Sequence, residues 1–149
     1  MMKKLFYLMA ICLLVAMTAC EFERSDNGAL DGFWQMHSID TLETGNTADM
    51  RQVGIYWSVQ MNMLTIAHHE EDELYQFRFS HDDDGLRLYD PRQCFRPGDG
   101  QRIDSAITDV TILLPLGLNS LDERFKVLEL NHSRMVLVNS LYRMHFRKY

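Results

Sequence analysis

Residues 55–66 read IYWSVQMNMLTI, and apolar and polar side chains alternate through them with a period of two. This period is typical of an antiparallel strand that turns one face to a core. The apolar side chains change from odd to even positions near Asn62, which indicates a bulge or a turn at that point. The segment therefore predicts two strands that meet near Asn62.

The same alternation recurs along the rest of the chain. Asp84-Gly85, between two alternating stretches, is typical of a β-hairpin. Further strands are predicted at Gly32–Ile39, around Tyr75–Phe79, and at Leu86–Tyr89, Phe125–Leu130, Arg134–Asn139 and Leu141–Tyr149. Eight or nine short strands in one domain favour an all-β, antiparallel barrel or sandwich. A barrel of about eight strands is either just filled by its side chains or holds one small ligand.

The region between the hairpin and the closing strands is expected to be less regular. Asp90–Arg102 contains two prolines and two glycines after its first residue, which predicts a long irregular loop. Ile103–Leu114 fits one face of a helix and also fits a strand, and we favour a helix that Pro115 ends. Ser120–Glu123 has the spacing of a capping box and predicts a single helical turn.

The first nineteen residues have the three parts of a secretory signal. Lys3 and Lys4 are positively charged, Leu5–Met17 is apolar, and small residues follow immediately before Cys20. The apolar stretch is shorter than the roughly 20 residues that span a bilayer as a helix. We therefore expect cleavage after residue 19, then a flexible tether at 20–30 and one β domain at 31–149.

Met17-Thr18-Ala19-Cys20 resembles the lipobox of bacterial lipoproteins, although Met replaces the commoner Leu at its first position. The resemblance implies that Cys20 becomes the acylated N-terminus, since two or three acyl chains anchor a protein stably to a membrane. The expected location is the cell envelope, on the outer membrane. The sequence does not predict whether the protein lies on the periplasmic face or on the outer surface. The alternative is an ordinary signal that leaves Cys20 as a free thiol.

Charge and cysteine content narrow the function classes. Loss of Lys3 and Lys4 with the signal leaves 13 basic and 21 acidic residues, a formal charge of −8. This charge disfavours nucleic acid as a partner. Of the three cysteines, Cys12 leaves with the signal and Cys20 is expected to carry lipid, so Cys94 has no partner for an intramolecular disulfide.

Gly32-Phe33-Trp34 at the first strand and the basic closing strand 141–149 together resemble lipocalin-like domains. The nearer resemblance is to small lipocalin-like lipoproteins of unknown function from gut Gram-negative bacteria. It implies that Trp34 closes one end of the barrel and packs against an arginine of a late strand, here Arg147 or Arg143. Other β-barrels and sandwiches are the alternatives.

Four aromatic residues on the inward positions of two strands are candidates for lining an apolar pocket: Trp57, Tyr75, Phe77 and Phe79. The alternative is that they form a solid core, because barrels of this size fill readily with side chains.

Two acidic runs and one basic group are weaker candidates. His68–Glu73 and Asp82–Asp84 contain atoms that bind divalent cations, but neither run has a recognised ligand spacing, so solvated loops are favoured and no metal is expected. Arg92, Arg96 and Arg102 could together meet a carboxylate or phosphate, although a solvated loop is again favoured. Cys94 lies among them without a Cys-His signature, so we expect a buried or loop thiol rather than a nucleophile.

The sequence contains no nucleophile elbow, phosphate-binding Gly-rich loop or His-Glu-x-x-His motif. We therefore expect a lipid-anchored binding module without catalysis or cofactor, whose partner is a small apolar or amphipathic molecule. The main alternative is a structural or accessory protein with a filled barrel that docks another envelope protein. An enzyme that uses the barrel mouth is a third hypothesis.

Overall fold

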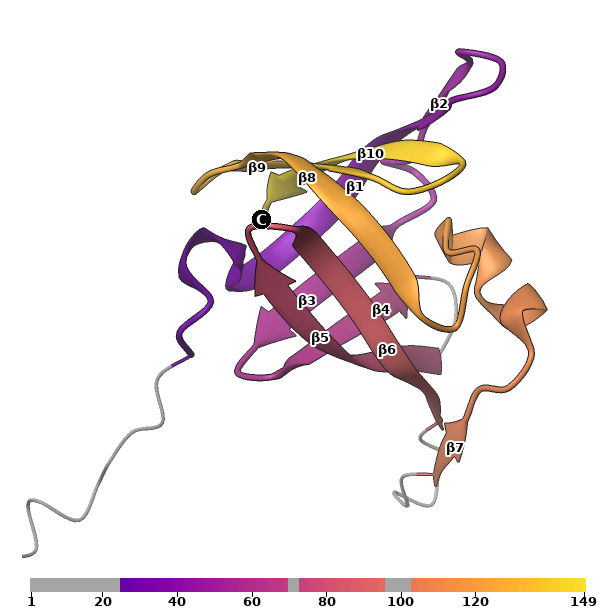
Figure 1. The fold of residues 1–149 in the computed structure, drawn as a ribbon. Helices are drawn as coiled ribbons and strands as arrows, with labels where there is room; N and C mark the ends of the chain where they lie inside the picture. The colour runs from indigo at the N-terminus through magenta and orange to yellow at the C-terminus, as the bar shows by residue number, and fades with distance from the viewer. Residues whose placement is uncertain (1–24, 70–72, 96–102) are drawn as a thin grey trace, which may run out of the picture.

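The computed structural model describes residues 25–69, 73–95 and 103–149. These residues form ten β-strands and three short 3-10 helical turns (Figure 1). In chain order they are η1 (Gly28–Leu30), β1 (Gly32–Thr41), β2 (Thr47–Asp49), β3 (Ile55–Gln60), β4 (Met63–His68), β5 (Glu73–Asp82), β6 (Gly85–Phe95), β7 (Ile103–Ala106), η2 (Val110–Ile112), η3 (Leu114–Leu116), β8 (Glu123–Leu130), β9 (Arg134–Val138) and β10 (Tyr142–Lys148). Within these three ranges, no helix has the length and hydropathy needed to cross a bilayer.

The sheet closes into a barrel because β10 pairs with β1 as well as with β9. Around the ring the order is β1, β3, β4, β5, β6, β8, β9 and β10, and every pairing is antiparallel. β2 pairs with the second half of β1, and β7 pairs with the second half of β6, so these two strands are additions to the ring. The predicted antiparallel barrel of about eight strands is confirmed.

The turns between neighbouring strands follow the local sequence. Gln60 pairs with Met63, so Met61 and Asn62 form a two-residue turn, and the change of apolar phase there is a turn rather than a bulge. The predicted β5–β6 hairpin is present, but Asp82 pairs with Gly85, so its turn is Asp83-Asp84 instead of Asp84-Gly85. Between β8 and β9, the Asn131 side chain accepts hydrogen bonds from the backbone amides of Ser133 and Arg134. Turn residues therefore locate these hairpins in the sequence.

The prediction of an irregular loop from Asp90 is wrong for residues 90–95, because β6 continues through them. The pairs Gln76–Arg92 and Arg78–Tyr89 leave two residues of β6, Asp90 and Pro91, opposite Phe77 alone. This is a β-bulge, and Asp90 has a φ of 51° there. A bulge accommodates a proline inside a sheet, since the residue it displaces need not donate to the ladder. Residues 96–102 lie outside the described ranges.

The favoured helix over Ile103–Leu114 is also wrong. The segment contains the four-residue strand β7 followed by an irregular stretch and η2, and Pro115 lies inside η3 rather than ending a helix. Ser120–Glu123 does not form a helical turn either. The Glu123 carboxylate accepts from the amides of Asn119 and Ser120, so it caps a bend that leads into β8.

Residues 25–30, predicted to belong to a flexible tether, are hydrogen-bonded to the barrel. The Met61 amide donates to Ser25 Oγ over 2.7 Å, and Asn27 Nδ2 donates to the Met61 carbonyl over 2.7 Å. These contacts hold η1 against one end of the barrel, where Leu30 is buried. The rest of the predicted tether, residues 20–24, lies outside the described ranges.

Candidate functional site

The barrel interior contains all four aromatic residues that the sequence nominates as pocket-lining. Trp57 is fully buried, and Tyr75, Phe77 and Phe79 are between 2% and 8% exposed. The centroid of the Trp57 ring lies 4.8 Å from that of the Phe146 ring and 5.9 Å from that of the Phe125 ring. The four residues therefore belong to one apolar cluster. Any ligand in the barrel would share this space with closely packed rings.

The two indole groups of the chain have opposite hydrogen-bond states, although Trp34 and Trp57 are direct partners in the β1–β3 ladder. Trp34 Nε1 donates to the Leu30 carbonyl over 2.8 Å. Trp57 Nε1 is buried and has no acceptor within hydrogen-bond distance in the described part of the chain. A buried donor without a partner is costly, so its persistence calls for an explanation.

Lys148, rather than Arg147 or Arg143, packs on Trp34. The register pairs Trp34 with Lys148 and pairs Gln35 with Arg147, so side-chain alternation places Arg147 on the outer face. The Lys148 ammonium lies 4.8 Å from the centre of the Trp34 ring and donates to the Ala29 carbonyl over 3.0 Å. A lysine, one position after Arg147, therefore takes the place of the arginine that the resemblance implied.

The opposite end of the barrel is filled by the segment that contains η2 and η3. Leu113, Leu116 and Leu118 are buried in the core cluster. Gly117 lies against Met144 and Ile39 with a φ of 80°, and its carbonyl accepts from Asn139 Nδ2 in the β9–β10 turn over 3.0 Å. We call residues 113–118 the leucine plug. Its contacts block the interior from that end.

Glu123 is the buried carboxyl nearest to the leucine plug in sequence, at 5% exposure. Burial raises the pKa of Glu123, although backbone amides of Asn119, Ser120 and Arg124 donate to the carboxylate and oppose the rise. These amides tie the carboxylate to the bend before β8, so its role is to fix the chain that follows the plug.

The arginine and metal candidates are described only in part. Arg92 is exposed and lies 3.8 Å from Asp90, while Arg96 and Arg102 lie outside the described ranges. Cys94 is buried and its thiol donates to Gln76 Oε1 over 3.3 Å. Among the residues with described placement, no group of three or more histidine, cysteine or acidic side chains is arranged to hold a metal ion. Residues 70–72 of the first acidic run fall outside those ranges.

Sequence reasoning missed the leucine plug and Lys148. The run Leu113-Leu114-Pro115-Leu116-Gly117-Leu118 is apolar around a proline and a glycine, which indicates a buried irregular segment better than it indicates a helix. Lys148 could be found only from the register of β10 against β1. Cys20 and the signal lie outside the described residues, so lipidation stays a prediction.

The chain resembles known proteins both in sequence and in fold. The family model described as a lipocalin-like domain matches residues 14–149. A lipocalin-like protein from Bacteroides uniformis has a similar structure, with a TM-score of 0.60, 17% identity, and coverage of 82% of this chain and 100% of the other. An uncharacterised protein from Bacteroides eggerthii has a TM-score of 0.51, 16% identity, and coverage of 80% and 98%. No curated protein matches significantly. With its closed barrel and with a family match over most of its length, the chain belongs to the lipocalin-like domain family.

Proposed function

We propose that this protein is a lipid-anchored binding protein of the cell envelope, whose barrel takes up a small apolar or amphipathic molecule and performs no catalysis. Two features support a ligand inside the barrel: the lipocalin-like fold, and an interior composed almost entirely of apolar side chains. Small-molecule sites are mostly apolar, with a few polar groups that orient the ligand. In this barrel the group that fits the orienting role is the indole N–H of Trp57.

The unpaired Trp57 Nε1 is the observation that carries the proposal. Burying an N–H without an acceptor costs about 1 to 3 kcal/mol, and a ligand oxygen would recover much of that cost. The neighbouring Trp34 shows that the backbone can supply an acceptor for an indole in this barrel, since the Leu30 carbonyl accepts a hydrogen bond from Trp34 Nε1. A ligand with an apolar body and one acceptor atom therefore matches the interior.

Entry of such a ligand requires the leucine plug to move. The plug is held by apolar contacts of its leucines and by the Asn139–Gly117 hydrogen bond, and its ends are irregular segments rather than strands. Segments with few backbone ladder bonds open at lower free energy than the strands of a sheet. The plug is therefore the element of the described barrel that we expect to open.

Decanoate, which has an apolar chain and carboxylate acceptors, is a suitable probe. Replacing Trp57 by phenylalanine should weaken its binding by about 10-fold, because the carboxylate loses the indole N–H as its donor. Trp34→Phe is the matched control, since it removes an indole N–H from the neighbouring position and should leave affinity unchanged. The two variants should also differ in stability without ligand. Trp34→Phe leaves the Leu30 carbonyl without its hydrogen-bond donor, whereas Trp57→Phe leaves no acceptor without a donor. Calorimetric titration and urea unfolding of both variants measure these effects.

Mass spectrometry of the protein extracted from its native membrane tests the same proposal without choosing a ligand. The proposal is supported if an apolar molecule co-purifies stoichiometrically with the native protein and is lost from the Trp57→Phe variant. If the protein is ligand-free and neither variant changes decanoate binding, the binding proposal fails.

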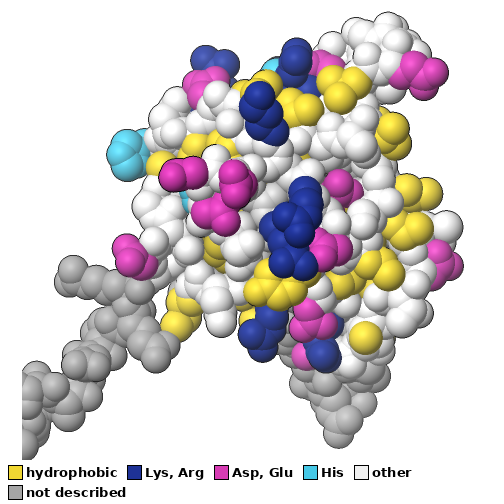
Figure 2. Space-filling model, viewed as in Figure 1, with side chains coloured by type: hydrophobic (Ala, Val, Ile, Leu, Met, Phe, Trp, Pro, Cys, Tyr) yellow, Lys and Arg dark blue, Asp and Glu magenta, His cyan; other side chains and the backbone are white. Residues whose placement is uncertain are grey.

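The second candidate function is an accessory role in which the filled barrel docks an envelope protein. Figure 2 shows hydrophobic side chains gathered along the flank that η2 and η3 occupy in Figure 1. Ile112 and Leu114 in these turns are 37% and 48% exposed. Exposed apolar groups of this kind can mark protein contacts. The ligand-free outcome above would favour this role.

Membrane attachment through Cys20 is tested separately. In Cys20→Ala the acceptor of the acyl chains is gone, so the protein should move from the membrane fraction to the soluble fraction or remain as uncleaved precursor. Fractionation followed by intact-mass measurement distinguishes these forms, with Cys94→Ala as the control that keeps its anchor. Unchanged membrane association with a mature, unacylated mass would contradict the proposed lipid anchor.

A further inference from the structure

A β-bulge on the outside of the barrel creates a hollow next to basic side chains. The register of β1 against β10 shifts between Met36 and Ser38, so His37 is the extra residue. Beside it lies a hollow of about 220 Å³, and a second of about 380 Å³ adjoins it through the shared residues His37 and Ser38. The first is also lined by Arg134, Val136, His145, Phe146 and Arg147, and the second by Thr47, Asp49 and Arg51. We call the two hollows together the bulge groove.

Three guanidinium groups surround the bulge groove. Arg147 and Arg134 are direct partners in the β10–β9 ladder, and Arg51 approaches from the turn after β2. Arg51 lies 2.6 Å from the carboxylate of Asp49, and Arg134 lies 3.4 Å from that of Glu129. Arg147 makes no ion pair with any described residue, so its charge is available to a ligand.

Arg147 and Arg51 place positive charge near His37, although the whole chain carries a formal charge of −6. Burial, together with the positive charges of Arg147 and Arg51, lowers the pKa of His37, against the opposing effect of Asp49. These charged groups come from β10, from the β2–β3 turn and from β2. An anion placed among them would be attracted by Arg147 and Arg51 and opposed by Asp49.

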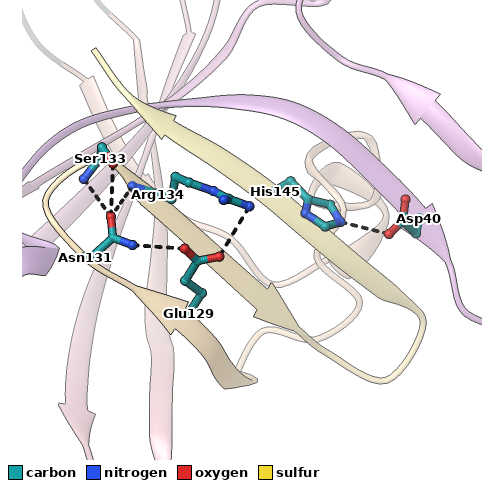
Figure 3. Close-up of polar contacts among 6 residues, drawn as sticks. All are labelled: Asp40, Glu129, Asn131, Ser133, Arg134 and His145. Carbon is teal, nitrogen blue, oxygen red and sulfur yellow. Dashed lines mark hydrogen bonds and ion pairs between the residues drawn. The ribbon is translucent and has the colours of Figure 1, made fainter.

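The other polar side chains of the groove are held in place by neighbours (Figure 3). His145 Nε2 lies 2.8 Å from Asp40 Oδ2. The other carboxylate oxygen of Asp40 accepts a hydrogen bond from the Thr47 hydroxyl over 2.7 Å. Glu129, which pairs with Arg134, also accepts from Asn131 Nδ2 over 2.9 Å. Groups fixed in this way lose less conformational entropy when a ligand binds.

We propose that the bulge groove binds a small oxyanion, a carboxylate or a phosphate monoester, with Arg147 as its principal donor and with His37 and Arg134 beside it. The planar guanidinium of Arg147 can donate two parallel hydrogen bonds to such a group. The site is on the outer surface, so it is distinct from the proposed ligand space in the barrel. Its oxyanion can come from a free metabolite or from the headgroup of a phospholipid.

The test is an NMR titration of the His37 imidazole in the full mature protein, held in nonionic detergent, with inorganic phosphate as the probe. Phosphate should shift the His37 signals saturably and raise the pKa of that imidazole, whereas chloride at equal ionic strength should do neither. Arg147→Gln should weaken the effect of phosphate by about 10-fold, because it removes a charge-assisted hydrogen bond. The control is Arg124→Gln, an exposed arginine of β8 that does not line the groove.

A second arm distinguishes the two sources of the oxyanion. The same signals are followed in micelles doped with phosphatidic acid and in undoped micelles. Saturation by the doped lipid assigns the groove to headgroups, and saturation by phosphate alone assigns it to a free anion. The proposal is overturned if neither probe produces a saturable shift, or if Arg124→Gln weakens binding as much as Arg147→Gln does.

Discussion

Trp34→Ala is expected to lower the free energy of unfolding by about 3 to 5 kcal/mol, the usual cost of truncating a large buried aromatic residue. Trp34 is fully buried, donates to the Leu30 carbonyl, and lies under the Lys148 ammonium. Its removal opens a cavity and breaks one of the hydrogen bonds that hold η1 at the end of the barrel. Urea unfolding followed by far-UV circular dichroism measures the loss.

Lys148→Met separates the contributions at this site, because it keeps an apolar chain over the ring and removes only the ammonium. The cation–π contact and the hydrogen bond to the Ala29 carbonyl each contribute about 1 kcal/mol, so this variant should lose less stability than Trp34→Ala. An equal loss from both variants would show that the ammonium, rather than the buried ring, closes this end of the barrel.

Gly85→Ala is the second substitution for which we expect a large effect, about 3 kcal/mol or more. Gly85 begins β6 with a φ of 128°, a conformation that L-residues rarely adopt, and a Cβ there would lie 2.1 Å from the Phe125 carbonyl oxygen. Backbone strain and overpacking each cost about 1 to 3 kcal/mol. This steric clash lies beside the β6–β8 pairing, which contains only three residue pairs. The substitution should therefore weaken the pairing of β6 with β8 that helps to close the barrel.

Gly45→Ala is the matched control for this prediction. Gly45 also has a positive φ, 71°, but a Cβ there would meet nothing within 4 Å. Only the conformational cost of about 1 to 2 kcal/mol applies. If urea unfolding gives equal losses for Gly85→Ala and Gly45→Ala, the collision with Phe125 is not the main cause of the destabilisation.

Some features of the candidate sites followed from sequence, and others did not. The inward position of Trp57 was predictable, because alternation within β3 assigns each side chain to a face. The unpaired state of its indole was not, because it depends on which atoms from distant strands surround it. The bulge groove was likewise not predicted, since His37 becomes an extra residue only in the pairing of β1 with β10, about a hundred residues later in the chain.

By itself the sequence determined the class of the fold and the positions of most strands. The period of two and the turn residues near Asn62 and at Asp84-Gly85 are local features, and local features are sufficient for hairpins, although Gly85 itself already belongs to β6. Only the tertiary structure decided how the ends of the barrel are filled. Whether residues 113–118 form a helix or a plug, and whether Lys148 or Arg147 covers Trp34, depends on register and packing between segments far apart in the chain, which no local pattern encodes.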